Sequence, residues 1–120
     1  MGNIMRGFGF AFKGLWYVLR YERNARIHLV AAVFAFGLGV YMRVTDVELA
    51  AIFFAIIIVF LAEIVNTAFE KTLDLIDTNH NPKIMIIKDM AAGAVLVAAS
   101  AAALMGIVIF TPYFVRLWQN

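Results

Sequence analysis

A long apolar run in the middle of this chain ends directly on a carboxylate. Residues 51–62 contain no polar side chain, and Glu63 follows them. In a membrane helix a charged side chain costs about 2.5–3.5 kcal/mol at the centre of the span and less near the interface, so such residues usually face a partner or a cavity. The run therefore predicts a helix in apolar surroundings that presents Glu63 to a functional site.

Polar side chains continue along one side of the same predicted helix. They recur at steps of three and four, as Glu63, Asn66, Glu70, Asp74 and Asp77. Residues at that spacing share one side of an α-helix. Because the periodicity does not break, we expect the helix to leave the membrane and continue to Ile76. The alternative for Glu70 and Asp74 is an ordinary solvated face on a protruding helix.

The composition favours an all-α membrane protein with a single domain over residues 1–120. Hydrophobic residues make up 64% of the chain and charged residues 15%, whereas soluble proteins are about 45–50% apolar and about 25% charged. A formal net charge of +2 is too small to indicate a nucleic-acid partner. The absence of cysteine excludes a disulfide framework and a thiolate metal site.

The segment 1–26 is typical of an amphipathic helix at the membrane surface. Its apolar residues and its basic residues recur on different sides, as Phe8, Phe12, Leu15 and Leu19 against Arg6, Lys13 and Arg20. This pattern suits a helix that lies in the headgroup region. The alternative is a solvated helix that covers a protein core.

Three membrane spans are predicted, at 27–44, 47–66 and 90–110. Thr45 and Glu48 match a capping box at the start of the second span. A loop rich in turn-forming residues occupies 77–82. The third span is crowded with alanine and glycine, which lets helices approach closely, and Thr111-Pro112 is expected to end it.

The basic residues predict the orientation of the chain. Eight of the ten Lys and Arg residues lie in the N-terminal segment and in the connection before the third span. Because positive charge accumulates on the cytoplasmic side, we expect a cytoplasmic N-terminus and acidic helix, and an external C-terminus. Three spans cannot surround a polar cluster from all sides, so an oligomer is the physical expectation.

The polar residues of three segments meet at this cytoplasmic interface. They are Glu22, Arg23, Asn24, Arg26 and His28, then Glu63, Asn66, Glu70 and Asp74, and finally Lys88 and Asp89. Carboxylates bind Mg²⁺ together with substrate phosphates, a lysine attracts phosphate, and a carboxylate can take a hydroxyl proton. No glycine loop of the common nucleotide-binding kinds is present.

Structural roles compete with these chemical ones. Glu22 and Arg26 stand at i, i+4 and could form a plain surface salt bridge. Lys88 and Asp89 could anchor and cap the third span. His28 is interpreted as a polar interface residue.

Together these residues resemble the bacterial integral-membrane diacylglycerol kinase and undecaprenol kinase family. The matching pieces are Lys13-Gly14-Leu15, the stretch from Glu22 to His28, the Glu63-x-x-Asn66-x-x-x-Glu70 helix with Asp74, and Lys88-Asp89 with Gly93. The resemblance implies a surface helix, three spans and a homotrimer with active sites shared between subunits. It also implies transfer of the ATP γ-phosphate to a lipid hydroxyl with Mg²⁺, at the bacterial inner membrane.

The resemblance also implies roles for single residues. Glu63 would be the general base, supported by Asn66, while Glu22 and Glu70 would hold the metal. Phe10, Glu22, Glu70, Lys88 and Asp89 would bind the nucleotide. Weaker candidates are Lys13, Arg26, Asp74, His80 and Asn81, the last two in a loop where the chain departs from the family pattern.

The acceptor and the class of function leave alternatives open. The Glu22–His28 motif is more similar to the undecaprenol kinase branch, which favours formation of undecaprenyl phosphate over phosphatidic acid from diacylglycerol. A small oligomeric transporter or scaffold, in which Glu63 couples protons or seals the assembly, is the alternative from a different class. It fits less well because the spans carry almost no deeper polar group than Ser100.

Overall fold

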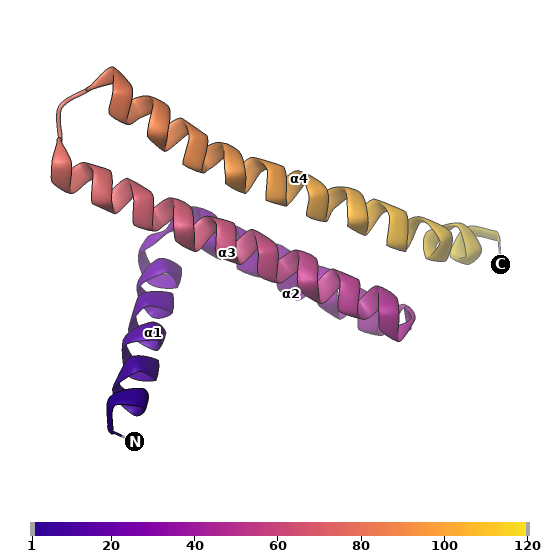
Figure 1. Ribbon diagram of the computed structural model, residues 1–120. Coiled ribbons are helices and arrows are strands. Elements are labelled where there is room, and N and C mark those ends of the chain that lie inside the picture. The colour runs from indigo at the N-terminus through magenta and orange to yellow at the C-terminus, as the bar shows by residue number, and fades with distance from the viewer. Residues whose placement is uncertain (1, 120) are drawn as a thin grey trace.

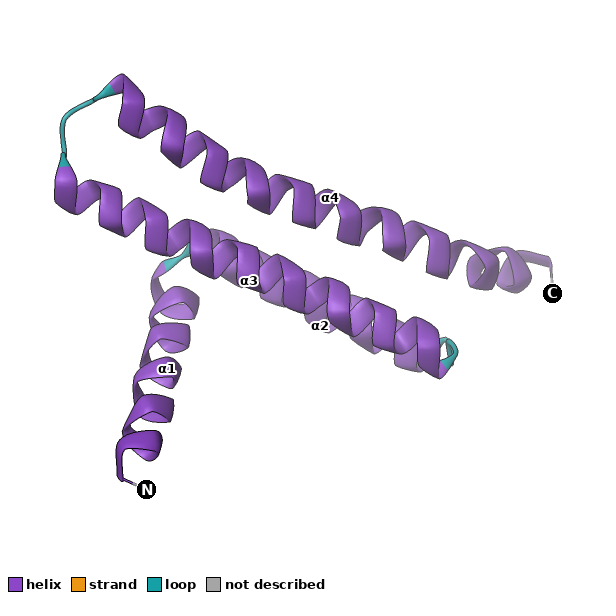
Figure 2. Cartoon of the chain, viewed as in Figure 1, coloured by secondary structure: helices purple, strands orange, loops and turns teal. Residues whose placement is uncertain are grey.

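The computed structural model describes residues 2–119, so Met1 and Asn120, the ends of the predicted domain, lie outside the described residues. It contains four helices: α1 (Gly2–Tyr21), α2 (Arg23–Tyr41), α3 (Asp46–Ile76) and α4 (Pro82–Gln119). Helices α2, α3 and α4 run beside one another, and α1 projects away from them at the α1–α2 junction (Figure 1). Only short connections separate the helices (Figure 2).

Helix α3 begins and ends as the sequence predicts. The Thr45 side chain accepts a hydrogen bond from the Glu48 backbone N–H, and the Glu48 side chain accepts one from the Thr45 N–H, which confirms the capping box. The helix holds 31 residues, which at 1.5 Å per residue make about 46 Å against a hydrocarbon thickness of about 30 Å. The extension to Ile76 is therefore confirmed, and the helix is longer than a span requires.

Helix α3 lies at the centre of the packing, with α4 as its most extensive neighbour and α2 as the second. The buried side chains of α3 form one stripe that starts with Ile52 and Val59 and continues through Glu63 and Asn66. At the opposite end from Ile76, a small core joins Val44, Ile52, Ile109 and Phe110. The same face of α3 thus changes from apolar to polar along its length.

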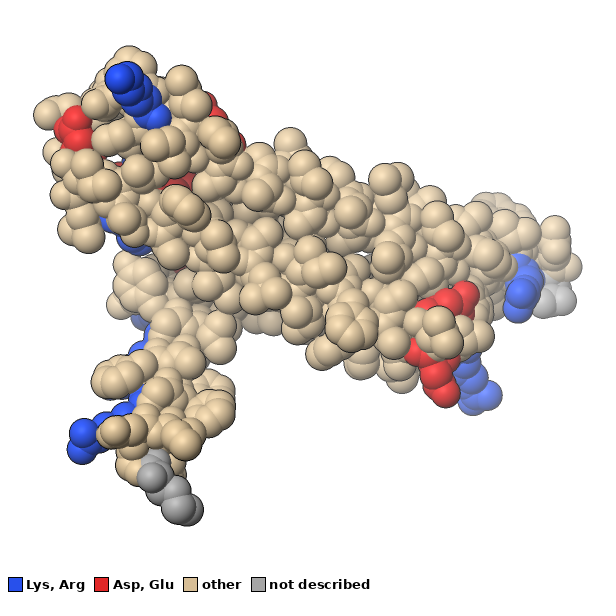
Figure 3. Space-filling model, in the orientation of Figure 1, with Lys and Arg blue, Asp and Glu red and all other residues tan. Residues whose placement is uncertain are grey.

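The apolar side chains face mostly outward, as in a chain that lies in lipid. Helices α2, α3 and α4 are each long and apolar enough to cross a membrane. On the face shown in Figure 3, charged side chains gather at the two ends of the three-helix bundle, and its middle is free of them. The prediction of an all-α membrane protein with three long apolar helices is confirmed.

The helix predicted over 1–26 is interrupted at Glu22. Glu22 adopts an extended conformation (φ −95°, ψ 117°) and is the N-cap of α2. The first apolar helix therefore begins at Arg23 rather than Ile27. No glycine or proline marks this break, so the sequence periodicity could not place it.

The end of α2 is a Schellman closure rather than a continuation to Val44. The N–H of Val44 donates to the carbonyl of Gly39, and the N–H of Arg43 donates to that of Val40. This pattern requires a left-handed residue at its centre, and Arg43 supplies it with φ 53°. The turn directs Val44 into the small core.

The expectation that Thr111-Pro112 ends the last helix is wrong, because α4 continues through Pro112 to Gln119. A proline inside a helix removes one backbone hydrogen bond. Beyond it, the Tyr113 hydroxyl donates to Glu48 Oε2 at 2.6 Å and ties this end of α4 to α3. This hydrogen bond to α3 stabilises the part of α4 that follows Pro112.

Candidate active site

Glu63 occupies the packed face of α3, where it is 2% exposed. Asn66 and Thr67 beside it are also buried. Among the described residues, neither Glu63 Oε2 nor Asn66 Oδ1 has a hydrogen-bond partner. A buried polar atom without a partner costs about 1–3 kcal/mol, and more when it is charged. Two such atoms one helical turn apart indicate groups held ready for a substrate.

Asn66 contacts the next carboxylate along the helix, Glu70. Its Nδ2 donates to Glu70 Oε1 at 3.3 Å. Glu70 is only half-buried, so the helix face passes from a buried carboxylate to one that solvent reaches. The two carboxylates are seven positions apart, a distance of about 10.5 Å along the helix axis.

His28 approaches this cluster from α2, where the sequence interpretation treated it only as a polar interface residue and did not predict its pairing with Glu63. Its Nε2 lies 3.9 Å from Glu63 Oε2, and its side chain is 23% exposed. The distance is beyond hydrogen-bond range but within the range of an ion pair if the imidazole is protonated. The pairing depends on how α2 packs against α3, and residue spacing along the sequence does not predict this packing.

Glu22 contacts α3 rather than its own helix. Its Oε1 lies 3.3 Å from Lys71 Nζ, while Arg26 donates to the carbonyl of Arg20 at 2.8 Å. The predicted alternative of a Glu22–Arg26 salt bridge is therefore wrong. Hydrogen bonding to Glu22, followed by the charge of that carboxylate, raises the pKa of Lys71. The contact places Glu22 beside the acidic half of α3.

Asp74 and Lys88 form an ion pair between the end of α3 and the first turns of α4. Asp89 follows Lys88 and is exposed. In the loop between the helices, Asn81 Oδ1 accepts a hydrogen bond from the Lys83 N–H at 3.0 Å and so caps α4. His80 is exposed in the same loop.

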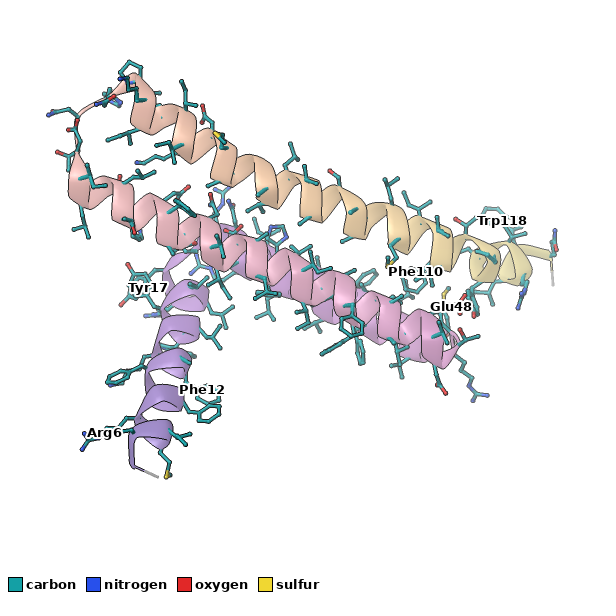
Figure 4. All side chains as sticks on the ribbon, viewed as in Figure 1. Arg6, Phe12, Tyr17, Glu48, Phe110 and Trp118 are labelled. Carbon is teal, nitrogen blue, oxygen red and sulfur yellow. The ribbon has the colours of Figure 1, made fainter. Side chains whose placement is uncertain are left out.

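Phe10 and Lys13 lie apart from this cluster. Lys13 Nζ is 5.8 Å from the centroid of the Phe10 ring, and Phe10 is 68% exposed. Both belong to α1, which projects away from α3 and α4, as the labelled Phe12 shows (Figure 4). Within one chain, the structure brings Glu22, His28, Glu63, Asn66 and Glu70 to one end of the bundle and leaves the α1 candidates outside it.

The carboxylates at this end fit Mg²⁺ by their chemistry. Residues 2–119 contain no group of three or more His, Asp or Glu side chains that could hold a metal by themselves. Mg²⁺ does not need such a group, because it is usually bound by one or two carboxylates together with substrate phosphates and water. Glu22 and Glu70 supply donors of that kind.

Comparison with known proteins identifies the family of this chain. The model of the prokaryotic diacylglycerol kinase family matches residues 9–110, from α1 to the small core in α4. This chain belongs to the prokaryotic diacylglycerol kinase family. It is a lipid kinase and a multi-pass membrane protein, which confirms the predicted enzyme class over the transporter or scaffold alternative.

Two relatives carry different substrate names. The chain is 37% identical to undecaprenol kinase of Bacillus subtilis over 112 residues, which cover 93% of this chain and 91% of that protein. It is 31% identical to diacylglycerol kinase of Synechocystis over 116 residues, which cover 96% of this chain and 66% of that protein. Both are similar along nearly the whole of this chain.

Proposed function

We propose that this lipid kinase transfers the γ-phosphate of ATP to undecaprenol and forms undecaprenyl phosphate. The observation that carries the proposal is the buried Glu63 carboxylate, whose Oε2 has no hydrogen-bond partner in the described chain. It stands where the apolar part of α3 gives way to the polar part. An acceptor whose hydroxyl is attached to a hydrocarbon chain fits such a boundary.

Glu63 is proposed as the general base. Its free oxygen accepts the proton of the lipid hydroxyl while the lipid oxygen attacks the γ-phosphorus. The bond between the γ-phosphorus and the β,γ-bridging oxygen breaks, ADP leaves, and Glu63 returns its proton to solvent. Asn66, also buried, supports Glu63 and holds Glu70 through its amide.

The nucleotide is proposed to lie at the Glu70 end of the helix. Glu22 and Glu70 would hold Mg²⁺, which when bound neutralises charge on the phosphates. Lys88 and Asp89 would contact the nucleotide, with Asp74 holding the Lys88 ammonium. Lys88 adds a positive charge for phosphate.

A homotrimer with shared sites would explain the position of α1. Phe10, which is assigned to the nucleotide, and Lys13 belong to α1, which projects away from α2, α3 and α4 in one chain. In a neighbouring subunit the same helix could reach a second site. The exposed apolar surfaces of α2, α3 and α4 leave room for contacts between copies as well as with lipid.

The site is proposed to face the cytoplasm of a bacterial inner membrane. Most Lys and Arg residues lie in α1, in the first turns of α2, and around the α3–α4 connection. By the positive-inside rule this distribution supports a cytoplasmic N-terminus and site, with the C-terminus outside. ATP is then available at the Glu70 end.

Diacylglycerol is the second candidate acceptor, because one relative carries that name. The test is phosphate transfer from radiolabelled ATP in nanodiscs that contain either undecaprenol or diacylglycerol, with and without Mg²⁺. We expect Mg²⁺-dependent labelling, with a higher kcat/KM for undecaprenol. A higher kcat/KM for diacylglycerol would overturn the choice of acceptor, and labelling that persists in EDTA would overturn the metal assignment.

A further inference from the structure

An apolar cavity of about 270 Å³ opens between α2, α3 and α4, and its wall on α3 ends at Phe60, shortly before Glu63, the proposed base. Of the residues that line it in the described chain, His28 alone has a polar side chain. The α3 part of the wall runs from Ile52 to Phe60, which is about 12 Å along the helix axis. The cavity is therefore an apolar space with one polar end.

His28 connects this cavity with the site. It belongs to the cavity wall, and its Nε2 lies 3.9 Å from Glu63 Oε2, the oxygen without a hydrogen-bond partner. Two polar atoms at this distance can share a bridging group that lies to one side of the line joining them. A hydroxyl oxygen between the two side chains can donate its proton to Glu63 and, if His28 carries a proton on Nε2, accept a hydrogen bond from it.

We infer that His28 positions the acceptor lipid: it orients the hydroxyl against Glu63, while the hydrocarbon next to that hydroxyl occupies the cavity. The inference rests on the proposed role of Glu63. It adds His28 as a positioning residue and the apolar cavity as the binding site of the hydrocarbon. A hydrocarbon chain is the occupant that fits, since the wall is apolar up to His28, and His28 adjoins Glu63 at the proposed acceptor site.

The walls of the cavity explain why a chain can enter it. Alanine and glycine predominate on two of its sides, at Ala31, Ala32 and Ala35 of α2 and at Ala99, Ala102, Ala103 and Gly106 of α4. Small side chains leave the space that larger ones would fill. Ala102 lines the cavity, whereas its neighbour Ala101 is exposed and does not.

The first test compares His28→Leu with His28→Gln in nanodiscs, using undecaprenol and ATP as the varied substrates. Leucine removes the polar group, and glutamine keeps an amide donor. We expect His28→Leu to lower kcat/KM for undecaprenol by roughly 10–100-fold, the loss typical of a misplaced reactant, with the KM for ATP within about twofold of the original. His28→Gln should recover most of the loss. An unchanged kcat/KM for the lipid, or an equal effect on ATP, would overturn the inference.

The second test does not depend on the folding of a His28 variant. Ala102→Leu fills the cavity, and Ala101→Leu adds the same volume one residue away on the exposed surface. The first should raise the KM for undecaprenol several-fold and the second should not. If Ala102→Leu instead changed only the oligomer size, the cavity would be a contact between copies, and the inference would fail. Because the wild-type protein is assayed first, absence of transfer to any lipid alcohol would overturn the proposed function rather than the role of His28.

Discussion

Helix α3 carries a glutamate near each end of its apolar part, and the two are held in opposite ways. Glu48 Oε2 accepts hydrogen bonds from the Thr45 N–H, the Thr45 hydroxyl and the Tyr113 hydroxyl, at 2.8, 2.9 and 2.6 Å. Glu63 is more deeply buried, and its Oε2 has no hydrogen-bond partner within residues 2–119. A glutamate carboxylate thus connects two helices at one end of the apolar part, whereas at the other end a glutamate oxygen has no hydrogen-bond partner among the described residues.

The difference shows how to separate structure from function in a chain this apolar. A buried polar group that the fold itself satisfies contributes to stability, whereas an unsatisfied one costs stability and persists where a substrate uses it. Glu48 joins the start of α3 to the end of α4. Glu63 has no such structural partner on its Oε2, which is why we propose that a substrate uses it.

Glu63→Gln should produce the largest effect. An amide cannot accept the hydroxyl proton, so kcat for lipid phosphorylation should fall by roughly 10²–10⁴-fold, the usual contribution of a general base. Steady-state transfer from radiolabelled ATP in nanodiscs measures it, with gel filtration to show that the oligomer is intact. Near-normal turnover would remove Glu63 as the base.

Glu70→Gln should have a smaller and different effect. If Glu70 helps to hold Mg²⁺, the metal concentration at half-maximal rate should rise on the order of tenfold or more, because one of few carboxylate ligands is lost. A Mg²⁺ titration of the initial rate at fixed ATP measures this. An unchanged titration would make Glu70 a structural residue that only orients Asn66.

Glu48→Ala should affect stability instead of chemistry. It removes the acceptor of three hydrogen bonds and one half of the capping box. We expect a melting temperature lower by a few degrees, measured by thermal unfolding in detergent. The rate at a temperature well below that transition should remain close to the original. A strong loss of activity without a thermal shift would contradict the structural role.

Arg43→Gly should have the smallest effect, and in the opposite direction. Arg43 holds the left-handed conformation of the turn between α2 and α3, which costs an L-residue about 1–2 kcal/mol and glycine little. Because glycine also gains freedom in the unfolded chain, the net stabilisation should be about 0.5–1 kcal/mol. A slightly higher melting temperature would show it, and a lower one would mean that the Arg43 side chain contributes contacts of its own.

Local patterns predicted the parts of the fold that depend on neighbours in the sequence. The capping box at Thr45 and the helical spacing from Glu63 to Asp74 both specify structure within a few residues. The start of the last helix was placed too late, because α4 begins at Pro82 and the span was predicted from residue 90. The family resemblance was also readable, because Glu63, Asn66 and Glu70 stand at fixed steps on one helix.

Contacts between helices could not be predicted in the same way. Glu22 pairs with Lys71 rather than Arg26, and His28 reaches Glu63, because of how α1 and α2 pack against α3. The helix through Pro112 was missed for the same reason, since Tyr113 beyond it bonds to a residue on α3. In each case the contact or the helix boundary depends on a residue far away in the sequence, and the spacing of residues along the chain does not predict it.

The most direct measurement is the single-turnover rate of phosphate transfer in Glu63→Gln and Glu48→Gln, prepared identically in nanodiscs with saturating ATP, Mg²⁺ and undecaprenol. The two variants make the same chemical change on the same helix. Transfer should fall by at least about 100-fold in Glu63→Gln and stay within about twofold of the original in Glu48→Gln. Equal rates in the two variants, whether both fast or both slow, would contradict this expectation.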